Sequence, residues 1–389
     1  MNQGKYIFSQ IMELISHKQF QTLIRRHKGD YKVKDFSCWK QYLCMVFGQL
    51  THRESLSDTI LCLKANADKT YHLGIGDVAA KSTLSTANEN RSYLIYYDLA
   101  MLLIKQAKQL YLGDSDLEVE LENNVFAIDA TTIDLCLSTF YWATFRKTKG
   151  GIKLHTQLNL KTAIPEFIYF SAASLHDVNA LDFICFDANS FYIMDKGYID
   201  YKRLYRIHKC DAFFVIRAKD NMNYRRLYSR TVDKTKGVLC DQTIMLNGFY
   251  AAKDYPEKIR RIKFYDQESR KTFIFLTNNL HLKATEVAQL YKHRWKIEVF
   301  FRWIKQHLKI KSFWGQSENA VKTQVWIAVS VYVLVAIAKK KFMIKQSLYE
   351  ILQILSISIF ERMPINQLFQ QTQKQYFKEL NHNQLKMFD

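Results

Sequence analysis

The spacing of apolar residues changes along the chain and predicts two kinds of structure. Up to about residue 112, apolar residues recur every three to four positions, which is typical of amphipathic helices. From about Glu118 this spacing gives way to runs of β-branched and aromatic residues, which are typical of strands. The helical pattern is clearest at residues 5–15, 39–50, 56–65 and 91–112.

The strand pattern predicts a mixed sheet in the middle of the chain. Three strands in succession, followed by strands that alternate with helices at 176–184 and 198–208, favour a mixed sheet with helices packed on it. A polar and basic stretch at 220–270 predicts a small β-rich insertion, after which residues 272–279 return to the main sheet. The other strands are expected at 125–137, 150–161, 166–174, 190–198 and 211–219.

Helical periodicity returns after the last strand. Residues 285–311 contain no Gly or Pro, so we expect one long helix that Thr285 caps, with Glu286 in its first turn. The apolar segment 325–338 is 14 residues long, whereas a membrane-spanning helix needs about 20. We therefore expect a buried helix there, followed by a helical tail with a Gln-rich end.

The charge of the chain narrows the class of its partner. The 389 residues suffice for two or three domains, and 56 Lys and Arg against 37 Asp and Glu give a net charge of +19. Such a surplus favours a polyanionic partner, although selection for solubility alone is the alternative. Seven cysteines without zinc-binding spacing predict small buried thiols in a reducing compartment. Since no signal peptide is evident, we expect a cytoplasmic protein without a membrane partner.

One face of the predicted helix at 285–311 carries an unusual set of polar residues. At 100° per residue, Tyr291, Arg294, Glu298 and Lys305 lie in a band about 60° wide. A simple interpretation is an exposed ion pair between Arg294 and Glu298, which contributes about 0.2–0.5 kcal/mol. The alternative is that Glu298 belongs to a larger acidic site.

Two aspartates at predicted strand ends are candidates for the rest of that site. Asp129 follows the apolar run 125–128, and Asp195 follows the apolar run 191–194. Burying a carboxylate is costly unless it is paired or binds a cation, and three carboxylates suit Mg²⁺ or Mn²⁺. Strand-end aspartates also cap turns, so each taken singly can be structural. The chain lacks the motifs G-x-S-x-G, H-E-x-x-H, G-x-G-x-x-G and the P-loop.

The residues of this helix also match a known signature. The spacing Tyr291-x2-Arg294-x3-Glu298-x6-Lys305 resembles the YREK signature of DDE transposases of bacterial insertion sequences, the IS-4 family. AIDATTIDL at 127–135 and MDKGYID at 194–200 are similar to the family's other two acidic elements. The resemblance extends over about residues 53–338. It departs from the family at Lys196, where Arg is common, and Lys loses the bidentate geometry toward phosphate.

The resemblance implies a fold and a domain organisation. We expect an α/β protein with a ribonuclease-H-like mixed sheet core, a β-rich insertion and an all-helical N-terminal domain. The helical DNA-binding domain would comprise residues 1–115, and the catalytic core residues 116–338, interrupted by the insertion at 220–270. Residues 339–389 would form a helical C-terminal tail.

The resemblance also implies a reaction. The protein would cleave DNA at the ends of its own insertion sequence and join the freed 3′-OH ends to target DNA. Asp129, Asp195 and Glu298 would be the catalytic residues and would bind Mg²⁺, or Mn²⁺, as two ions per active site. Joining two ends calls for two active sites, so we expect a homodimer on double-stranded DNA in the bacterial cytoplasm, associated with the nucleoid.

Further residues are expected to contact the DNA. Tyr291, Arg294 and Lys305 would hold phosphates near the cleaved bond, and Lys196 and Arg302 are further basic candidates. Trp295 would either stack on an unpaired base or pack in the core. Core packing is the expected role of Phe300, Phe301 and Trp303.

Two other functions remain open at this stage. A nuclease of the same fold would cleave DNA without joining it, and a catalytically idle relative would only bind DNA. Residues 73–96 resemble a turn between two short helices, which is either a helix-turn-helix that reads DNA or a common packing unit.

Overall fold

The computed structural model describes residues 4–370 except 116, 136–139, 141, 143, 147–148, 220 and 308–312. The chain divides into two compact units, which we describe separately. The sheet unit comprises residues 113–301, and the helical unit comprises residues 1–112 and 302–389. This division differs from the expected one, because residues 302–338 belong with the N-terminal helices rather than with the sheet.

A ten-stranded mixed sheet forms the sheet unit, as far as the structure describes it. Its order is β2-β3-β1-β5-β6-β10-β9-β8-β7, and β4 also pairs with β3. β1 runs antiparallel to β3 and parallel to β5, and β5 runs parallel to β6. The mixed sheet is therefore confirmed. The strands are β1 (Val125–Leu135), β2 (Thr144–Arg146), β3 (Lys149–Asn159), β4 (Pro165–Ala172), β5 (Phe191–Met194), β6 (Phe213–Arg217), β7 (Tyr224–Arg230), β8 (Val238–Leu246), β9 (Ile259–Asp266) and β10 (Lys271–Thr277).

The three parallel strands have one shared register. Ile128 on β1 is level with Met194 on β5, which is level with Ile216 on β6. These three residues belong to a buried apolar cluster on one face of the sheet. The cluster also contains residues of α8 (Tyr201–Lys209), η1 (Asp177–Phe183) and η2 (Lys196–Tyr198), and α9 (Phe249–Asp254) packs against it. Because successive side chains point to opposite faces, the next residue on each strand faces the other side.

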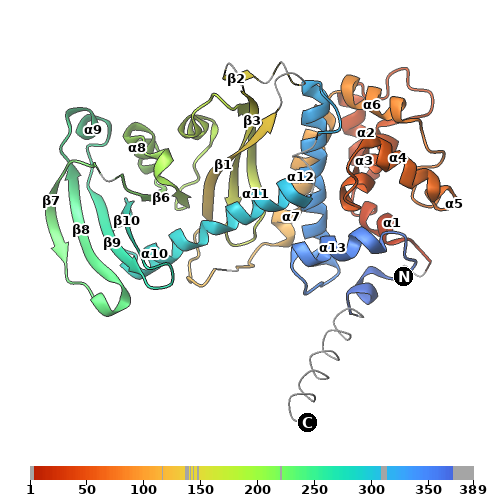
Figure 1. The fold of residues 1–389 in the computed structure, drawn as a ribbon. Coiled ribbons are helices and arrows are strands. Elements are labelled where there is room, and N and C mark those ends of the chain that lie inside the picture. The colour runs from red at the N-terminus through yellow and green to blue at the C-terminus, as the bar shows by residue number, and fades with distance from the viewer. Residues whose placement is uncertain are drawn as a thin grey trace, which may run out of the picture. The chain divides into compact units, whose positions relative to one another are not determined.

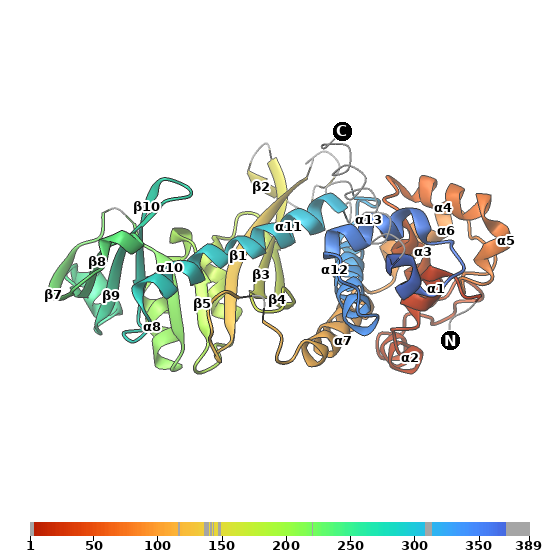
Figure 2. The same cartoon turned by 90° about the horizontal axis from the view of Figure 1, so that it is seen from below.

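The β-rich insertion extends the main sheet instead of forming a separate subdomain. β10 pairs antiparallel with β6, and β9, β8 and β7 follow outward in antiparallel order, with the short η3 (Lys234–Lys236) between β7 and β8. Both ribbon views show β7 at the outer edge beside β8 (Figure 1, Figure 2). The return of the segment at 272–279 to the main sheet is confirmed as far as residue 277, where β10 ends.

The expected long helix is two helices that meet at Arg294. α10 spans Ala284–His293 and α11 spans Trp295–His307, and residues 308–311 lie outside the described part of the chain. Tight three-residue hydrogen bonds flank the junction: Arg294 N–H donates to Tyr291 O, and Ile297 N–H donates to Arg294 O. Thr285 does not cap α10. The Lys283 N–H instead donates to the Glu286 carboxylate at 2.9 Å, which closes the first turn.

Helices make up the regular structure described in the helical unit. The central one is α12 (Glu318–Lys341), which packs most extensively against α7. α12 is longer than the apolar segment suggested, and its length and composition would suit a membrane span, but 94% of its apolar window is buried in this fold. It is therefore a core helix. The other helices are α1 (Ile7–Met12), α2 (His17–Arg26), α3 (Cys38–Leu50), α4 (Leu56–Ala65), α5 (Ala67–Thr70), α6 (Lys81–Asn90), α7 (Leu94–Leu110) and α13 (Leu348–Ser358).

Two smaller expectations need correction. The segment predicted as a helix at 176–184 is the 3₁₀ helix η1. The cysteines that the structure describes are free thiols, but only Cys38 and Cys44 are buried, and Cys185 is exposed. Cys136 lies outside the described residues.

Candidate active site

Two neighbouring parallel strands bring the predicted aspartates together. Ile128 and Met194 are level on β1 and β5, and each is followed directly by an aspartate, Asp129 and Asp195. The two carboxylates thus leave adjacent strands on the same face, the one opposite the apolar cluster. α10 contacts β5, β6 and β8. Because parallel strands are about 4.8 Å apart, this register alone makes the two acids neighbours.

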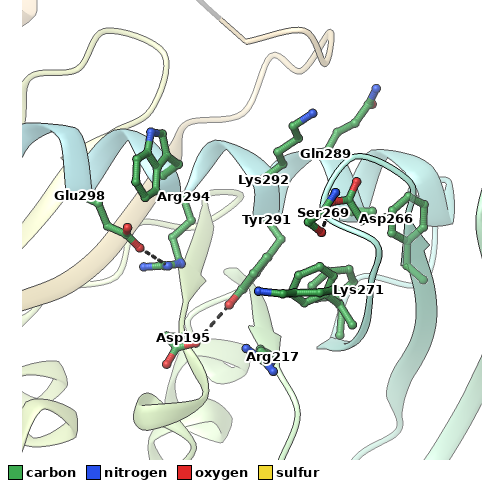
Figure 3. Close-up of a pocket in the computed structure, with 15 residues that line it drawn as sticks. Asp195, Arg217, Asp266, Ser269, Lys271, Gln289, Tyr291, Lys292, Arg294 and Glu298 are labelled. Atoms are coloured by element: carbon green, nitrogen blue, oxygen red, sulfur yellow. Dashed lines mark hydrogen bonds and ion pairs between the residues drawn. The ribbon is translucent and has the colours of Figure 1, made fainter.

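The junction between α10 and α11 supplies the third acid and two polar partners. The Tyr291 hydroxyl donates to Asp195 Oδ1 at 3.2 Å. Arg294 Nη1 donates to Asp129 Oδ2 at 2.9 Å, and its Nη2 donates to Glu298 Oε1 at 2.5 Å. Figure 3 shows the contacts of Tyr291 and Glu298, both on the same side of the two helices. The structure thus brings together all three predicted acids, with Tyr291 and Arg294 among them.

Burial and ion pairing have opposite effects on the pKa values of the charged groups in this site. Burial raises the pKa of Asp129 to about 6, although Arg294 and the hydrogen bond from the Ala130 N–H counteract the rise. Burial also disfavours the charge of Arg294, but Asp129, Tyr291 and Glu298 outweigh it and raise the pKa of the guanidinium. Burial raises the pKa of Tyr291 to about 12, so its hydroxyl stays protonated and can donate. Arg294 is therefore the cation that holds Asp129 and Glu298 together.

Several buried polar atoms beside the acids have no hydrogen-bond partner. They are Thr156 Oγ1, the Tyr198 hydroxyl and Arg294 Nε. Thr156 is the partner of Asp129 in the β1–β3 register, and burial raises the pKa of Tyr198 well above its ordinary value. Leaving a buried polar atom unpaired costs about 1–3 kcal/mol. This site therefore retains hydrogen-bonding capacity that the protein alone does not use.

Asp195 and Glu298 border a cavity of about 610 Å³ between β10 and the two helices. Aromatic side chains form one wall, where the Phe273 and Phe275 rings stack in parallel and Phe275 lies 4.8 Å from the Tyr291 ring. Arg217, at the end of β6, also lines the cavity, and sequence reasoning missed it. A signal was present: Arg217 follows the apolar run 213–216, just as each aspartate follows an apolar run.

The other residues predicted to contact DNA differ in their exposure and in the unit to which they belong. Trp295 lines the cavity and is 50% exposed, whereas Phe300, Phe301 and Trp303 are buried as expected. Lys196 is exposed directly after Asp195. Arg302 and Lys305 lie on the part of α11 that belongs to the helical unit, so their role toward DNA stays a prediction.

Comparison with known proteins shows which family the chain belongs to. Residues 120–334 match the family described as transposase DDE domain, which is more than half of the chain, and residues 3–76 match a domain of unknown function. A putative transposase of Sinorhizobium fredii is 31% identical over 288 residues, which cover 72% of this chain and 78% of that protein. The chain belongs to the DDE transposase family.

Further relatives carry similar names. A probable transposase for insertion sequence element IS5377 of Geobacillus stearothermophilus is 28% identical over 53% of this chain and 54% of its own length. A putative transposase for insertion sequence element IS4SA of Synechocystis is 23% identical over 67% of this chain and 72% of its own length. The piggyBac transposase in a synaptic complex with hairpin DNA aligns with a TM-score of 0.46 and 10% identity, over 98% of this chain and 86% of that one, too weakly to establish a shared fold.

This transposase therefore cleaves DNA and transfers its strands, and its family uses divalent metal ions for that chemistry. The donor set fits such ions, since Asp129, Asp195 and Glu298 offer only oxygen ligands. Among the described residues, no three acidic, His or Cys side chains meet in a ready metal site. Arg294 lies between Asp129 and Glu298 and pairs with both.

Proposed function

We propose that this transposase cuts at the ends of its own insertion sequence and that Asp129, Asp195 and Glu298 are its catalytic triad. The three carboxylates would bind Mg²⁺, or Mn²⁺, as two ions. When bound, such ions activate the attacking oxygen and stabilise the leaving oxygen in a phosphoryl transfer. Water would attack the terminal phosphodiester first, and the freed 3′-OH would then attack target DNA.

The strand arrangement supports a ribonuclease-H-like core for this site. β4, β3 and β1 form an antiparallel group, and β5 and β6 continue from β1 in parallel. Two acids lie on the central strands of this arrangement, and the third comes from the helix across the sheet. The observation that carries the proposal is the meeting of all three acids around Arg294 and Tyr291, where Arg294 contacts Asp129, a residue 165 positions earlier.

Residues of the helix junction would position the DNA. Arg294 holds Asp129 and Glu298 with its two terminal nitrogens, and its guanidinium would donate to a phosphate oxygen when DNA is bound. Tyr291 fixes Asp195 through its hydroxyl. Lys305, Lys196 and Arg302 would contact phosphates further along the strand, and Trp295 would stack on an exposed base.

Joining two ends calls for two active sites, so we propose that two copies of the chain act together on the DNA. Purified protein, a labelled duplex with the element's ends, supercoiled target DNA and either Mg²⁺ or EDTA test the proposal. We expect cleavage and joined product only with Mg²⁺. Glu298→Ala, Asp129→Ala and Asp195→Ala should abolish both products while end binding persists.

A matched control comes from the same strand. Asp134 is an exposed acid on β1, five residues beyond Asp129, and Asp134→Ala should cleave and join like the unmodified protein. Cleavage by any of the three triad variants would overturn the assignment. Cleavage without joining would indicate a nuclease, and binding without either product would indicate a protein that only binds DNA.

A further inference from the structure

We propose that Arg217 binds a phosphate of the DNA backbone inside the cavity beside the acids, and that Lys271 assists it. This inference rests on the proposed function and adds a substrate-binding residue that belongs neither to the triad nor to the Tyr291–Lys305 signature. Four observations support it: the position of Arg217, its available charge, the chemistry of its surroundings and the location of the cavity.

The position of Arg217 follows from the strand register. Met194 on β5 is level with Ile216 on β6, so Asp195 and Arg217 occupy equivalent places at the ends of adjacent parallel strands. Asp129, Asp195 and Arg217 therefore form a row on one face of the sheet, with about 4.8 Å between neighbouring strands. A phosphate held at Arg217 would lie one strand beyond Asp195, next to the phosphate under attack.

The charge of Arg217 is available. Lys292, another cation of the cavity, pairs with Glu268 at 2.7 Å, and Arg294 pairs with two of the acids. Within the part of the chain that the structure describes, neither Arg217 nor Lys271 forms an ion pair with a carboxylate. A partly buried guanidinium without a counterion is suited to an anion from outside the protein.

The surroundings of Arg217 orient its side chain without neutralising it. Its guanidinium lies over the Phe273 ring, 5.4 Å from the ring centroid. This stacking limits the rotamers of a long side chain and leaves the edge of the guanidinium free to donate. Figure 3 shows Lys271 extending toward Tyr291, with Arg217 on the same side of the helices as Asp195.

The cavity places this anion at the reaction site. Asp195, Tyr291, Arg294 and Glu298 line the same cavity as Arg217, so an anion bound there would lie beside the acids. For an enzyme that acts on DNA, the anion that necessarily reaches this position is a backbone phosphate. Phosphate contacts of this kind fix the register of DNA on a protein without reading its sequence.

A scan with neutral phosphates tests the inference. Single methylphosphonates would replace each phosphate near the cleaved bond in turn, and affinity would be measured in a Glu298→Ala background so that the DNA stays intact. We expect one neutral position next to the cleaved phosphate to weaken binding about tenfold. In the variant that also carries Arg217→Gln, the same replacement should cause no further loss, because the partner of that phosphate is already gone.

Two control variants make the outcome specific. Arg226→Gln removes an exposed charge on β7, outside the cavity, and should lower affinity without changing the pattern of sensitive positions. Arg217→Lys keeps the charge and should reduce the loss of affinity that the methylphosphonate causes, at the same position only. This variant replaces Arg217→Gln in the test if Arg217→Gln does not fold. An Arg217→Gln pattern identical to that of the background would overturn the inference. Failure of the proposed function looks different, because the unmodified protein would then fail to cleave its ends or to join them, whatever the pattern of sensitive phosphates.

Discussion

Arg294 donates a 2.9 Å hydrogen bond to Asp129, a residue 165 positions earlier in the chain. The same guanidinium also pairs with Glu298 one helical turn away, so a single cation links the sheet to α11. The side chain of Arg294 is 16% exposed, that of Asp129 is 22% exposed and that of Glu298 is 35% exposed. This ion triplet is thus mostly shielded from solvent, and its stability depends on all three members.

Arg294→Gln should lower the free energy of unfolding by about 1–3 kcal/mol, because Asp129 and Glu298 would be left without their cation. Urea denaturation measures the change. Lys292→Gln is the matched control two residues earlier, since the Lys292–Glu268 pair is largely exposed and should contribute less than about 1 kcal/mol. Equal losses in both variants would contradict a structural role for Arg294.

Tyr198→Phe should leave the melting temperature unchanged or raise it. The Tyr198 hydroxyl is buried without a partner, so its removal relieves a cost. Tyr192→Phe provides the contrast, because the Tyr192 hydroxyl accepts the Asp187 N–H at 2.8 Å and its loss should cost about 1–3 kcal/mol. Calorimetry of the two variants measures the difference. A destabilised Tyr198→Phe would mean that its hydroxyl has a partner in the free protein.

The site could be predicted from the sequence where polar residues follow apolar runs. Asp129 and Asp195 were found this way, and helical spacing grouped Tyr291, Arg294 and Glu298. The register of β1, β5 and β6 could not be predicted, because it depends on how separate strands align. Arg217 was therefore missed, although it follows an apolar run in the same way.

The helix break and the extended sheet were also beyond local pattern. No Gly or Pro marks Arg294, and the turn there coincides with the ion pairs that draw its side chain toward the sheet. The sequence of the insertion predicts short alternating strands. The insertion joins the main sheet because β10, which comes later in the chain, pairs with β6. Both features involve contacts between residues that lie far apart in the chain.

His155 should make the protein less stable as the pH falls from about 6.5 toward 4. Burial lowers the pKa of this histidine to about 4, so the folded protein keeps it neutral while the unfolded chain takes up a proton below pH 6.5. Its stabilising contribution is complete above pH 6.5 and is lost below it, by up to about 3 kcal/mol. The charged groups that act on it are Asp177, which favours protonation, and Lys153, which opposes it.

The control for this prediction separates His155 from the other titrating groups. Its ring nitrogen Nε2 bonds with the Ser171 hydroxyl at 2.8 Å, and its ring lies 6.0 Å from that of Tyr169. His155→Gln keeps a polar side chain there but cannot titrate. The free energy of unfolding of both proteins is measured at pH 4.5 and at pH 7.5. We expect the variant to be more stable relative to the unmodified protein at pH 4.5 than it is at pH 7.5. A constant difference would contradict the prediction.

Asp241→Asn should destabilise the sheet unit more than any exposed ion pair does. Asp241 and Arg260 are 6% and 3% exposed, and Arg260 donates to both carboxylate oxygens at 2.9 and 2.7 Å. Arg260 also donates to the Leu282 carbonyl, which ties β9 to the segment leading into α10. Asparagine would leave a buried guanidinium unpaired, at a cost of about 3–5 kcal/mol. Replacing both residues, as Asp241→Leu with Arg260→Met, should cost less than Asp241→Asn alone. Arg230, the other cation that pairs with Asp241, is 28% exposed and reaches solvent, so no fully buried charge then remains. Urea denaturation of the unmodified protein and the two variants measures this order. A double variant that loses as much stability as Asp241→Asn, or more, would contradict the prediction.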